Sequence, residues 1–158
     1  MELEMSQNAP IILAYVGVIL AIALSGGGSA YGVTLTAKAA IGGMKKTPES
    51  FGTFLILCTP PSTNGLYGFL GYFMMSGHLA AGTDLSMYKA AAIFAACTAL
   101  GIVNLCSAVF QGQASASAIA AISSGHDIFG KSLMVIVFAE LYAIVALAAL
   151  FLINQSLM

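Results

Sequence analysis

The sequence predicts an all-α membrane protein whose four transmembrane helices form two tandem hairpins. Three observations lead to this prediction: the composition, a set of long apolar windows and an internal repeat. Of the 158 residues, 59% are hydrophobic and 7% are charged, and the mean hydropathy is +0.97, whereas about 25% of an ordinary soluble domain is charged. The composition excludes a soluble domain, and we expect residues 1–158 to form a single membrane domain.

The apolar windows give the number and order of the helices. A hydrocarbon core of roughly 30 Å needs about 20 apolar residues per helical span. Four windows satisfy this length: Pro10–Met44, Phe51–His78, Met87–Ser124 and Ile128–Leu157. The first and third should project beyond the bilayer, because about 35 residues at 1.5 Å rise make roughly 50 Å. We expect one hairpin over residues 10–78 and a second over 87–157, joined by Gly77–Ser86.

The charged residues predict the orientation of these hairpins. Glu2 and Glu4 stand where a secretory signal would carry basic residues, so we expect the first apolar window to be retained as a span. Lysines flank the first and third loops, at positions Lys38, Lys45, Lys46 and Lys131. Excess lysine marks cytoplasmic loops, although Lys89 argues weakly against this assignment. Both hairpin loops are therefore predicted to be cytoplasmic, with both termini on the opposite side.

The two hairpins look like copies of one another. "ESFGTFLIL" from Glu49 and "DIFGKSLMV" from Asp127 share an acid-x-Phe-Gly entry into the next span. The offset between the copies is about 80 residues and shrinks slightly across the loops. Continuing the alignment pairs Ser62 with Glu140. The first copy therefore lacks the acid that the second copy carries.

The first and third windows contain small residues at four-residue intervals. Gly28 and Gly32 lie in "SGGGSAYG", and Gly112 and Ala116 continue a similar row in the third window. Such spacing lets the backbones of membrane helices approach closely. One interpretation is packing within a single four-helix bundle. The other, favoured by the large number of small residues, is a helix with neighbours on both sides in a narrow inner ring.

Glu140 is the one carboxylate in the apolar run Met134–Leu152. A charge at the membrane centre costs about 2.5–3.5 kcal/mol on insertion scales, and keeping such an acid protonated at neutral pH costs a similar amount. No lysine lies at a similar depth and the chain has no arginine. Its partner must therefore be a mobile ion or come from another chain. The alternative is a protonated acid that serves assembly alone.

The second window carries further polar residues. Thr63 and Tyr67 lie one helical turn apart on one face, and Asn64 is adjacent to Thr63. Pro60 and Pro61 remove two backbone donors. By propensity alone "PPSTNG" would be a loop, but its counterpart in the repeat is plainly helical. We therefore predict a helix with interrupted hydrogen bonding, which membrane proteins tolerate where neighbouring helices satisfy the freed groups.

The motifs resemble those of the proteolipid rotor protein, known as c or K, of V-type ATPases. The similar segments are the duplicated hairpin, the Gly-rich first span, "FQG" at Phe110–Gly112, "GLYGF" at Gly65–Phe69 and "FAELYAI" at Phe138–Ile144. The resemblance covers essentially the whole chain. It implies that identical subunits form a ring that carries a cation across the membrane while other subunits hydrolyse or make ATP. No catalytic residue, organic cofactor or nucleic-acid partner is expected.

The resemblance also implies an ion site. Glu140 matches the ion-carrying carboxylate, and Tyr67 matches a tyrosine that hydrogen-bonds it. The implied metal ligands are the side chains of Glu140, Gln111, Thr63 and Asn64 and the backbone carbonyl of Pro60. Asn64 stands where sodium-carrying relatives have a Gln, which is one methylene longer, and "ELY" stands where some have "ETY". Hard oxygen donors suit hard cations, so Na⁺ is favoured as the transported ion, with H⁺ as the alternative.

The resemblance further implies partners outside this chain. A stator membrane subunit would supply an Arg, central-stalk subunits would contact the loops at Lys45–Glu49 and Gly125–Gly130, and lipid would surround the ring, in the cell membrane of a prokaryote. Three other classes remain open: a passive channel, a small secondary transporter and a structural adaptor. The polar residues cluster at one depth, which favours a carrier over a channel. The two hairpins enter from the same side, unlike the inverted repeats of many transporters.

Overall fold

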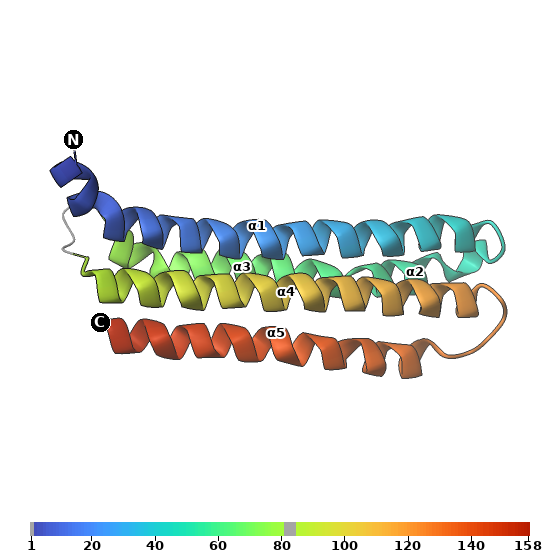
Figure 1. Cartoon of the computed structure of the whole chain (residues 1–158). Helices are drawn as coiled ribbons and strands as arrows, with labels where there is room; N and C mark the ends of the chain where they lie inside the picture. Colours follow the sequence, from blue (N-terminus) through green and yellow to red (C-terminus); the bar gives the residue numbers. More distant parts are fainter. Residues whose placement is uncertain (1, 81–84) are drawn as a thin grey trace.

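The computed structural model describes residues 2–80 and 85–158, with side chains from Asn8 onward. The helices in chain order are α1 (Glu2–Met44), α2 (Phe51–Cys58), α3 (Pro60–Met75), α4 (Met87–Ile122) and α5 (Phe129–Leu157), with short 3₁₀ helices η1 (Pro48–Ser50) and η2 (Ser76–Leu79). Figure 1 shows them side by side in one elongated bundle. The α1–α2 and α4–α5 loops lie at one end, called here the loop end, and both chain termini lie at the other.

Among the described residues, three helices are long and apolar enough to cross a membrane: α1 from Asn8, α4 and α5. The predicted span Pro10–Met44 lies within α1, which begins at Glu2 and so contains Pro10. Its first turns tilt away from the rest of the helix in Figure 1. Proline inside a helix removes a hydrogen bond and crowds the preceding turn, so a bend is its expected effect.

The predicted span Phe51–His78 is not one uninterrupted helix, because Thr59 separates α2 from α3. The "PPSTNG" stretch is helical as predicted, since α3 begins at Pro60. Proline is well suited to the first turn of a helix, where its missing N–H would have no partner. The Ile56 carbonyl, which Pro60 cannot bond, accepts from the Thr59 N–H at 3.2 Å and the Thr59 hydroxyl at 2.8 Å.

The loops end the helices by local hydrogen bonding. The α4 helix stops at Ile122, slightly before the predicted Ser124, and Gly125 has a φ of +92°. The N–H groups of Gly125 and His126 donate to the carbonyls of Ile122 and Ala121, a C-terminal motif that needs a left-handed residue. Of the predicted connection Gly77–Ser86, residues 81–84 lie outside the described residues. The Ser86 hydroxyl caps α4 by accepting from the Lys89 N–H at 3.3 Å.

The most extensive helix contact joins α1 and α4, called here the long pair. A Cβ added to Gly112 would lie 2.6 Å from the Cα of Gly32, and one added to Gly28 would lie 2.7 Å from the Cα of Leu105. Real side chains do not approach so closely, so the two backbones touch at these glycines. Ala116, from the same predicted row, is half-buried.

The two apolar clusters of the bundle interior lie towards its ends, and most of the buried polar side chains lie between them. One apolar cluster includes Val18, Met75 and Leu100, and a second, nearer the loop end, includes Phe54 and Ile119. The buried polar side chains along the middle of the bundle include Ser25, Ser29, Asn64, Asn104, Ser107, Gln111 and Ser115. Buried polar groups require hydrogen-bond partners, so this layer is where a functional site is expected.

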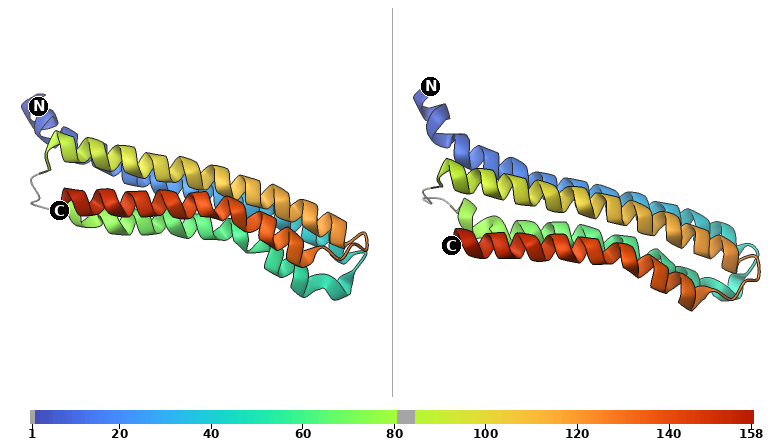
Figure 2. Two further views of the ribbon diagram at one scale, coloured as in Figure 1. Left: turned by 90° about the horizontal axis from the view of Figure 1, so that it is seen from below. Right: turned by 60° about the horizontal axis from the view of Figure 1, so that its bottom comes forward.

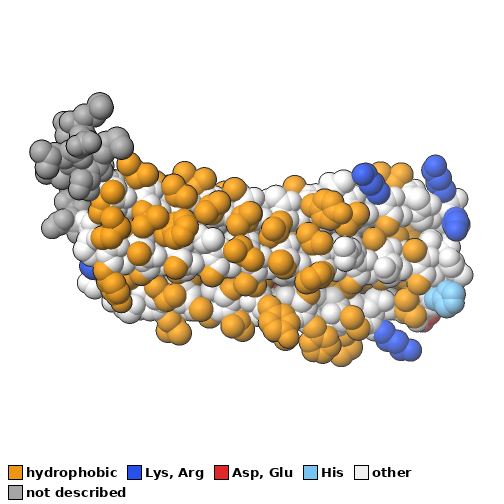
Figure 3. All heavy atoms as spheres, viewed as in Figure 1, with side chains coloured by type: hydrophobic (Ala, Val, Ile, Leu, Met, Phe, Trp, Pro, Cys, Tyr) orange, Lys and Arg blue, Asp and Glu red, His pale blue; other side chains and the backbone are white. Residues whose placement is uncertain are grey.

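The outer surface is apolar along the length of the bundle. Large hydrophobic side chains such as Ile19, Phe73 and Leu152 are exposed. Figure 3 shows hydrophobic side chains over most of one face, with most of the visible lysines near the loop end. A continuous apolar surface of this extent is suited to lipid and not to water.

Candidate ion-binding site

The Glu140 carboxylate, on α5, accepts hydrogen bonds from two other helices. Its Oε1 accepts from the Thr63 hydroxyl and from the Tyr67 hydroxyl, each at 2.6 Å, and both donors belong to α3. Its Oε2 accepts from Gln111 Nε2 on α4 at 2.5 Å. Short bonds of this kind are typical of charged acceptors. The arrangement brings together four of the residues that the sequence indicated.

The Thr63 hydroxyl has two acceptors within reach. Its oxygen lies 2.6 Å from Glu140 Oε1 and 2.8 Å from the Pro60 carbonyl oxygen. One hydroxyl donates a single hydrogen but can also accept. When Glu140 is ionised, Thr63 can donate to it; when Glu140 carries a proton, the Thr63 hydroxyl can accept a hydrogen bond from the carboxyl group and donate to the Pro60 carbonyl. The geometry therefore suits both protonation states of the carboxyl group.

Asn64 contacts the carboxylate only through Gln111. Its Nδ2 donates to Gln111 Oε1 at 2.7 Å, and both side chains are fully buried. Its Oδ1 has no hydrogen-bond partner among the described residues. A buried oxygen without a partner costs about 1–3 kcal/mol. Such an oxygen is suited to accept a hydrogen bond from a donor that turns towards it, or to bind a cation that enters the site.

Helix geometry explains why these side chains converge. Thr63 and Tyr67 are four residues apart on α3, so they share one face. On α4, Asn104, Gln111 and Ser115 are all fully buried, and intervals of four and seven residues place side chains on one stripe of a helix. Gln111 is the member of this stripe that lies beside α5.

Two serines at the site were not indicated by the sequence. The Ser29 hydroxyl on α1 donates to the Pro61 carbonyl and accepts from the Gly65 N–H, both at 2.7 Å. The Ser107 hydroxyl on α4 donates to the Ala139 carbonyl at 2.9 Å. A proline-interrupted turn signals that a donor must come from a neighbouring helix. The register between helices decides which residue supplies it, and local sequence does not encode that register.

Around Glu140 the surface of α5 is apolar. Phe138 and Tyr142 are 62% and 73% exposed, whereas Glu140 itself is half-buried. A half-buried carboxylate among apolar side chains interacts with a counter-ion more strongly than one in water. Chemically, the group can hold a proton or a hard cation together with the neighbouring oxygens.

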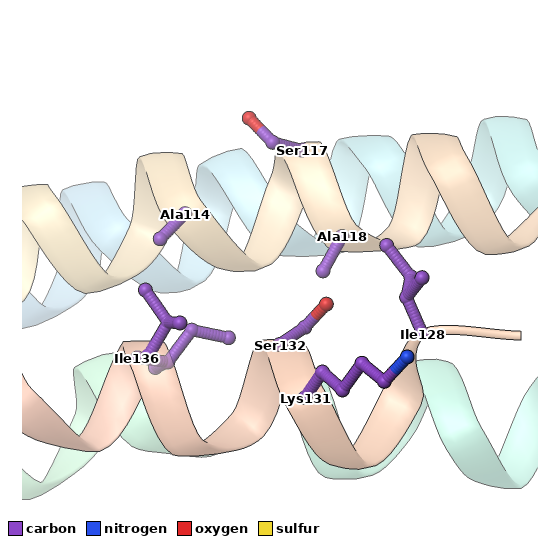
Figure 4. Close-up of a pocket in the computed structure, with 8 residues that line it drawn as sticks. Ala114, Ser117, Ala118, Ile128, Lys131, Ser132 and Ile136 are labelled. Atoms are coloured by element: carbon purple, nitrogen blue, oxygen red, sulfur yellow. The ribbon is translucent and has the colours of Figure 1, made fainter. Parts of the chain in front are cut away.

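A cavity of about 440 Å³ lies elsewhere, between α4 and α5 near the loop end. Figure 2 shows that α5 bends away from α4 towards that end. In Figure 4, Ala114 and Ala118 of α4 face Ser132 and Ile136 of α5, with Lys131 at the edge. Its lining is mainly apolar, and it contains no carboxylate. It is therefore not the candidate ion site.

Comparisons with known proteins agree with the duplicated arrangement. The family of ATP synthase C subunits matches twice, at residues 16–75 and 94–153, which confirms the internal repeat. "A-type ATP synthase subunit K" of Methanocaldococcus jannaschii is 35% identical over 87% of this chain, which spans 60% of that protein. "V-type sodium ATPase subunit K" of Enterococcus hirae is 32% identical over 96% of both chains.

Proposed function

Because the chain belongs to the family of ATP synthase C subunits, we propose that it is the rotor subunit of a rotary ATPase in which Glu140 carries one cation per chain. Its apolar helices make it an integral membrane protein. The observation that carries the proposal is the intramembrane carboxylate on α5, held by donors from α3 and α4. Carboxylates inside membranes are costly and mark ion pathways.

In this mechanism several copies form a ring, and each Glu140 is neutralised by its cation while it passes lipid. The exposed hydrophobic side chains beside it, Phe138 and Tyr142, suit that environment. An Arg of a stator subunit displaces the cation. This chain has no arginine of its own, so that residue must come from another subunit. ATP hydrolysis or synthesis takes place in other subunits, so this chain has no catalytic residue.

The loop end is proposed to face the cytoplasm and the central stalk. Lys45 and Lys46 lie beside the first loop, and Lys131 lies at the start of α5. Both loops line one polar cavity of about 340 Å³, which includes Glu49, His126 and Asp127. Excess lysine favours the cytoplasmic side, and the polar lining suits contact with a soluble subunit. The membrane is that of a prokaryotic cell.

Sodium is the favoured cation. Oxygens of Glu140, Thr63 and Pro60 lie in one network with the Gln111 side chain, and hard cations prefer oxygen ligands. Gln111 now directs its Nε2 to the carboxylate, so its amide must turn to offer Oε1 to sodium. If the Asn64 amide turns as well, its Oδ1, which has no partner among the described residues, can then accept from Gln111 Nε2. Asn64 thus supports the ligand set as the partner of Gln111 even if its shorter side chain does not reach the ion.

Carbodiimide labelling of Glu140 tests this proposal. The reagent modifies a carboxyl group mainly when it is protonated, so the labelling rate reports how often Glu140 is neutralised by a proton. At fixed pH and ionic strength, with choline chloride as the balancing salt, millimolar sodium should slow labelling. The protection should weaken as pH falls, because metal binding requires the deprotonated ligand.

Gln111→Ala provides the matched variant. It should abolish most of the sodium protection while leaving labelling in choline chloride intact, because the reactive carboxyl group is unchanged. Proton transport is the second candidate, favoured by the ability of Thr63 to accept a hydrogen bond from a protonated Glu140 while donating to the Pro60 carbonyl. If sodium leaves the labelling of the unaltered protein unchanged from neutral to mildly alkaline pH, the proton replaces sodium as the cargo.

A further inference from the structure

We propose that Ser29 is a positioning residue for the ion site, acting through the backbone of α3 without contacting the ion. Its hydroxyl lies between the two ends of one helical turn, donating to the Pro61 carbonyl and accepting from the Gly65 N–H. Both distances are 2.7 Å, and Ser29 is only 8% exposed. This turn contains Thr63 and Asn64, so the hydroxyl holds the segment that presents two site residues.

The first turn of α3 needs such support. Thr59 interrupts the helix, and Pro60 and Pro61 supply no N–H to the preceding turn. The start of α3 is therefore connected to α2 by fewer backbone bonds than an ordinary helix. A hydroxyl from α1 that bonds both Pro61 and Gly65 replaces part of this restraint. Freed backbone groups in membrane helices are commonly satisfied by a neighbouring Ser or Thr.

The packing around Ser29 leaves little freedom. A Cβ added to Gly65 would lie 3.1 Å from the Ser29 hydroxyl oxygen, so the glycine gives that oxygen the room it needs. A Cβ added to Gly32 would approach the Pro61 side chain at 2.7 Å. Thus α1 and the start of α3 are in close contact both at the hydroxyl and one turn further along α1.

The second hairpin contains a similar contact. The Ser107 hydroxyl on α4 donates to the Ala139 carbonyl at 2.9 Å, and Ala139 directly precedes Glu140. Pro61 directly precedes Ser62, which the repeat aligns with Glu140. In each hairpin, therefore, a serine of the long pair donates to the backbone carbonyl of the residue that precedes Ser62 or Glu140. The two contacts fix α3 and α5 relative to the long pair at the depth of the carboxylate.

The test measures sodium protection against carbodiimide in Ser29→Ala, and it rests on the proposed sodium site. Loss of the hydroxyl should raise the sodium concentration for half-protection about three- to thirtyfold, the effect of one or two buried hydrogen bonds. Ser29→Thr, which keeps a hydroxyl, should stay within about threefold of the unaltered protein. Thr34→Val is the control, because the Thr34 hydroxyl bonds Ala30 within α1 itself at 2.7 Å.

The outcomes separate this inference from the proposed function. If sodium does not protect the unaltered protein, the sodium proposal fails, and the pH at which labelling is half-maximal becomes the readout for Ser29→Ala. An unchanged midpoint, in sodium or in pH, overturns the positioning role. The role is also overturned if the midpoint shifts as far in Ser29→Thr as in Ser29→Ala. It is likewise overturned if the midpoint shifts as far in Thr34→Val as in Ser29→Ala. If Ser29→Ala does not assemble, Ser29→Cys, a weaker donor of similar size, should give an intermediate shift; no shift overturns the role.

Discussion

At the scale of single residues, the Glu140 site is defined by donors from different helices. The carboxylate accepts from Thr63, Tyr67 and Gln111, and removal of any one donor leaves a buried or half-buried oxygen with fewer partners. Hydrogen bonds to charged groups contribute about 1.5–3 kcal/mol each. Because Thr63 is also a proposed metal ligand, its loss should affect sodium more strongly than it affects helix stability.

Thr63→Val removes this hydroxyl while keeping the shape of the side chain. We expect the sodium concentration for half-protection against carbodiimide to rise at least tenfold, since about 1.4 kcal/mol corresponds to a factor of ten. Ser62→Ala is the control: Ser62 is exposed, and its hydroxyl bonds the Thr59 carbonyl of the same chain segment at 2.6 Å. Equal sodium sensitivity of Thr63→Val and the unaltered protein would remove Thr63 from the ligand set.

Residue types and helical spacing predicted much of this site, but not its connections. The intramembrane position of Glu140 and the one-turn spacing of Thr63 and Tyr67 were evident from the sequence. The contact of Asn64 with Gln111 instead of Glu140, and the contacts of Ser29 and Ser107 with backbone carbonyls, were not. They depend on how helices distant in sequence are rotated and shifted against one another, which local patterns do not specify.

At the scale of elements, close packing of the long pair sets the position of Gln111. Gly112 follows Gln111 directly, and its Cα hydrogen faces the backbone of Gly32. The four-residue spacing of small residues predicted close approach of these helices. Helix ends were predicted less well than the spans. The α1 helix extends beyond the predicted span to Glu2, because a helix tolerates a proline such as Pro10 near its end, and Thr59 interrupts the second span where only the prolines suggested a break.

Gly112→Ala tests this packing. An added Cβ would lie 2.6 Å from Gly32 Cα and 2.8 Å from the Gly32 carbonyl oxygen, so the two backbones must separate. Overpacking of this kind costs about 1–3 kcal/mol, and we expect a lower temperature of thermal unfolding in detergent. Gly42→Ala, also in a helix of the long pair, should be neutral or stabilising, because its Cβ meets nothing within 4 Å and alanine favours the helix. Equal unfolding temperatures for both variants would contradict the close-packing account.

At the scale of the whole molecule, the two hairpins are copies of one another, but only the second has a carboxylate, Glu140, at the aligned position. The family matches both halves, and the sequence alone predicted that repeat because its motifs recur at a nearly constant offset. Ser62 takes the aligned position in the first hairpin and, unlike Glu140, is uncharged. Each chain should therefore contribute one ion to each rotation of the ring, half of what two acid-bearing hairpins would contribute.

Equilibrium binding of labelled sodium, counted per chain in the purified ring, tests this account most directly. We predict a ratio near one at saturation for the unaltered protein and no specific binding for Glu140→Gln, which keeps the size of the side chain but removes its charge. Rings of both proteins should be equally intact by electron microscopy, so a difference in binding is not a difference in assembly. A ratio near two, or undiminished binding by Glu140→Gln, would contradict the assignment of one cation to Glu140.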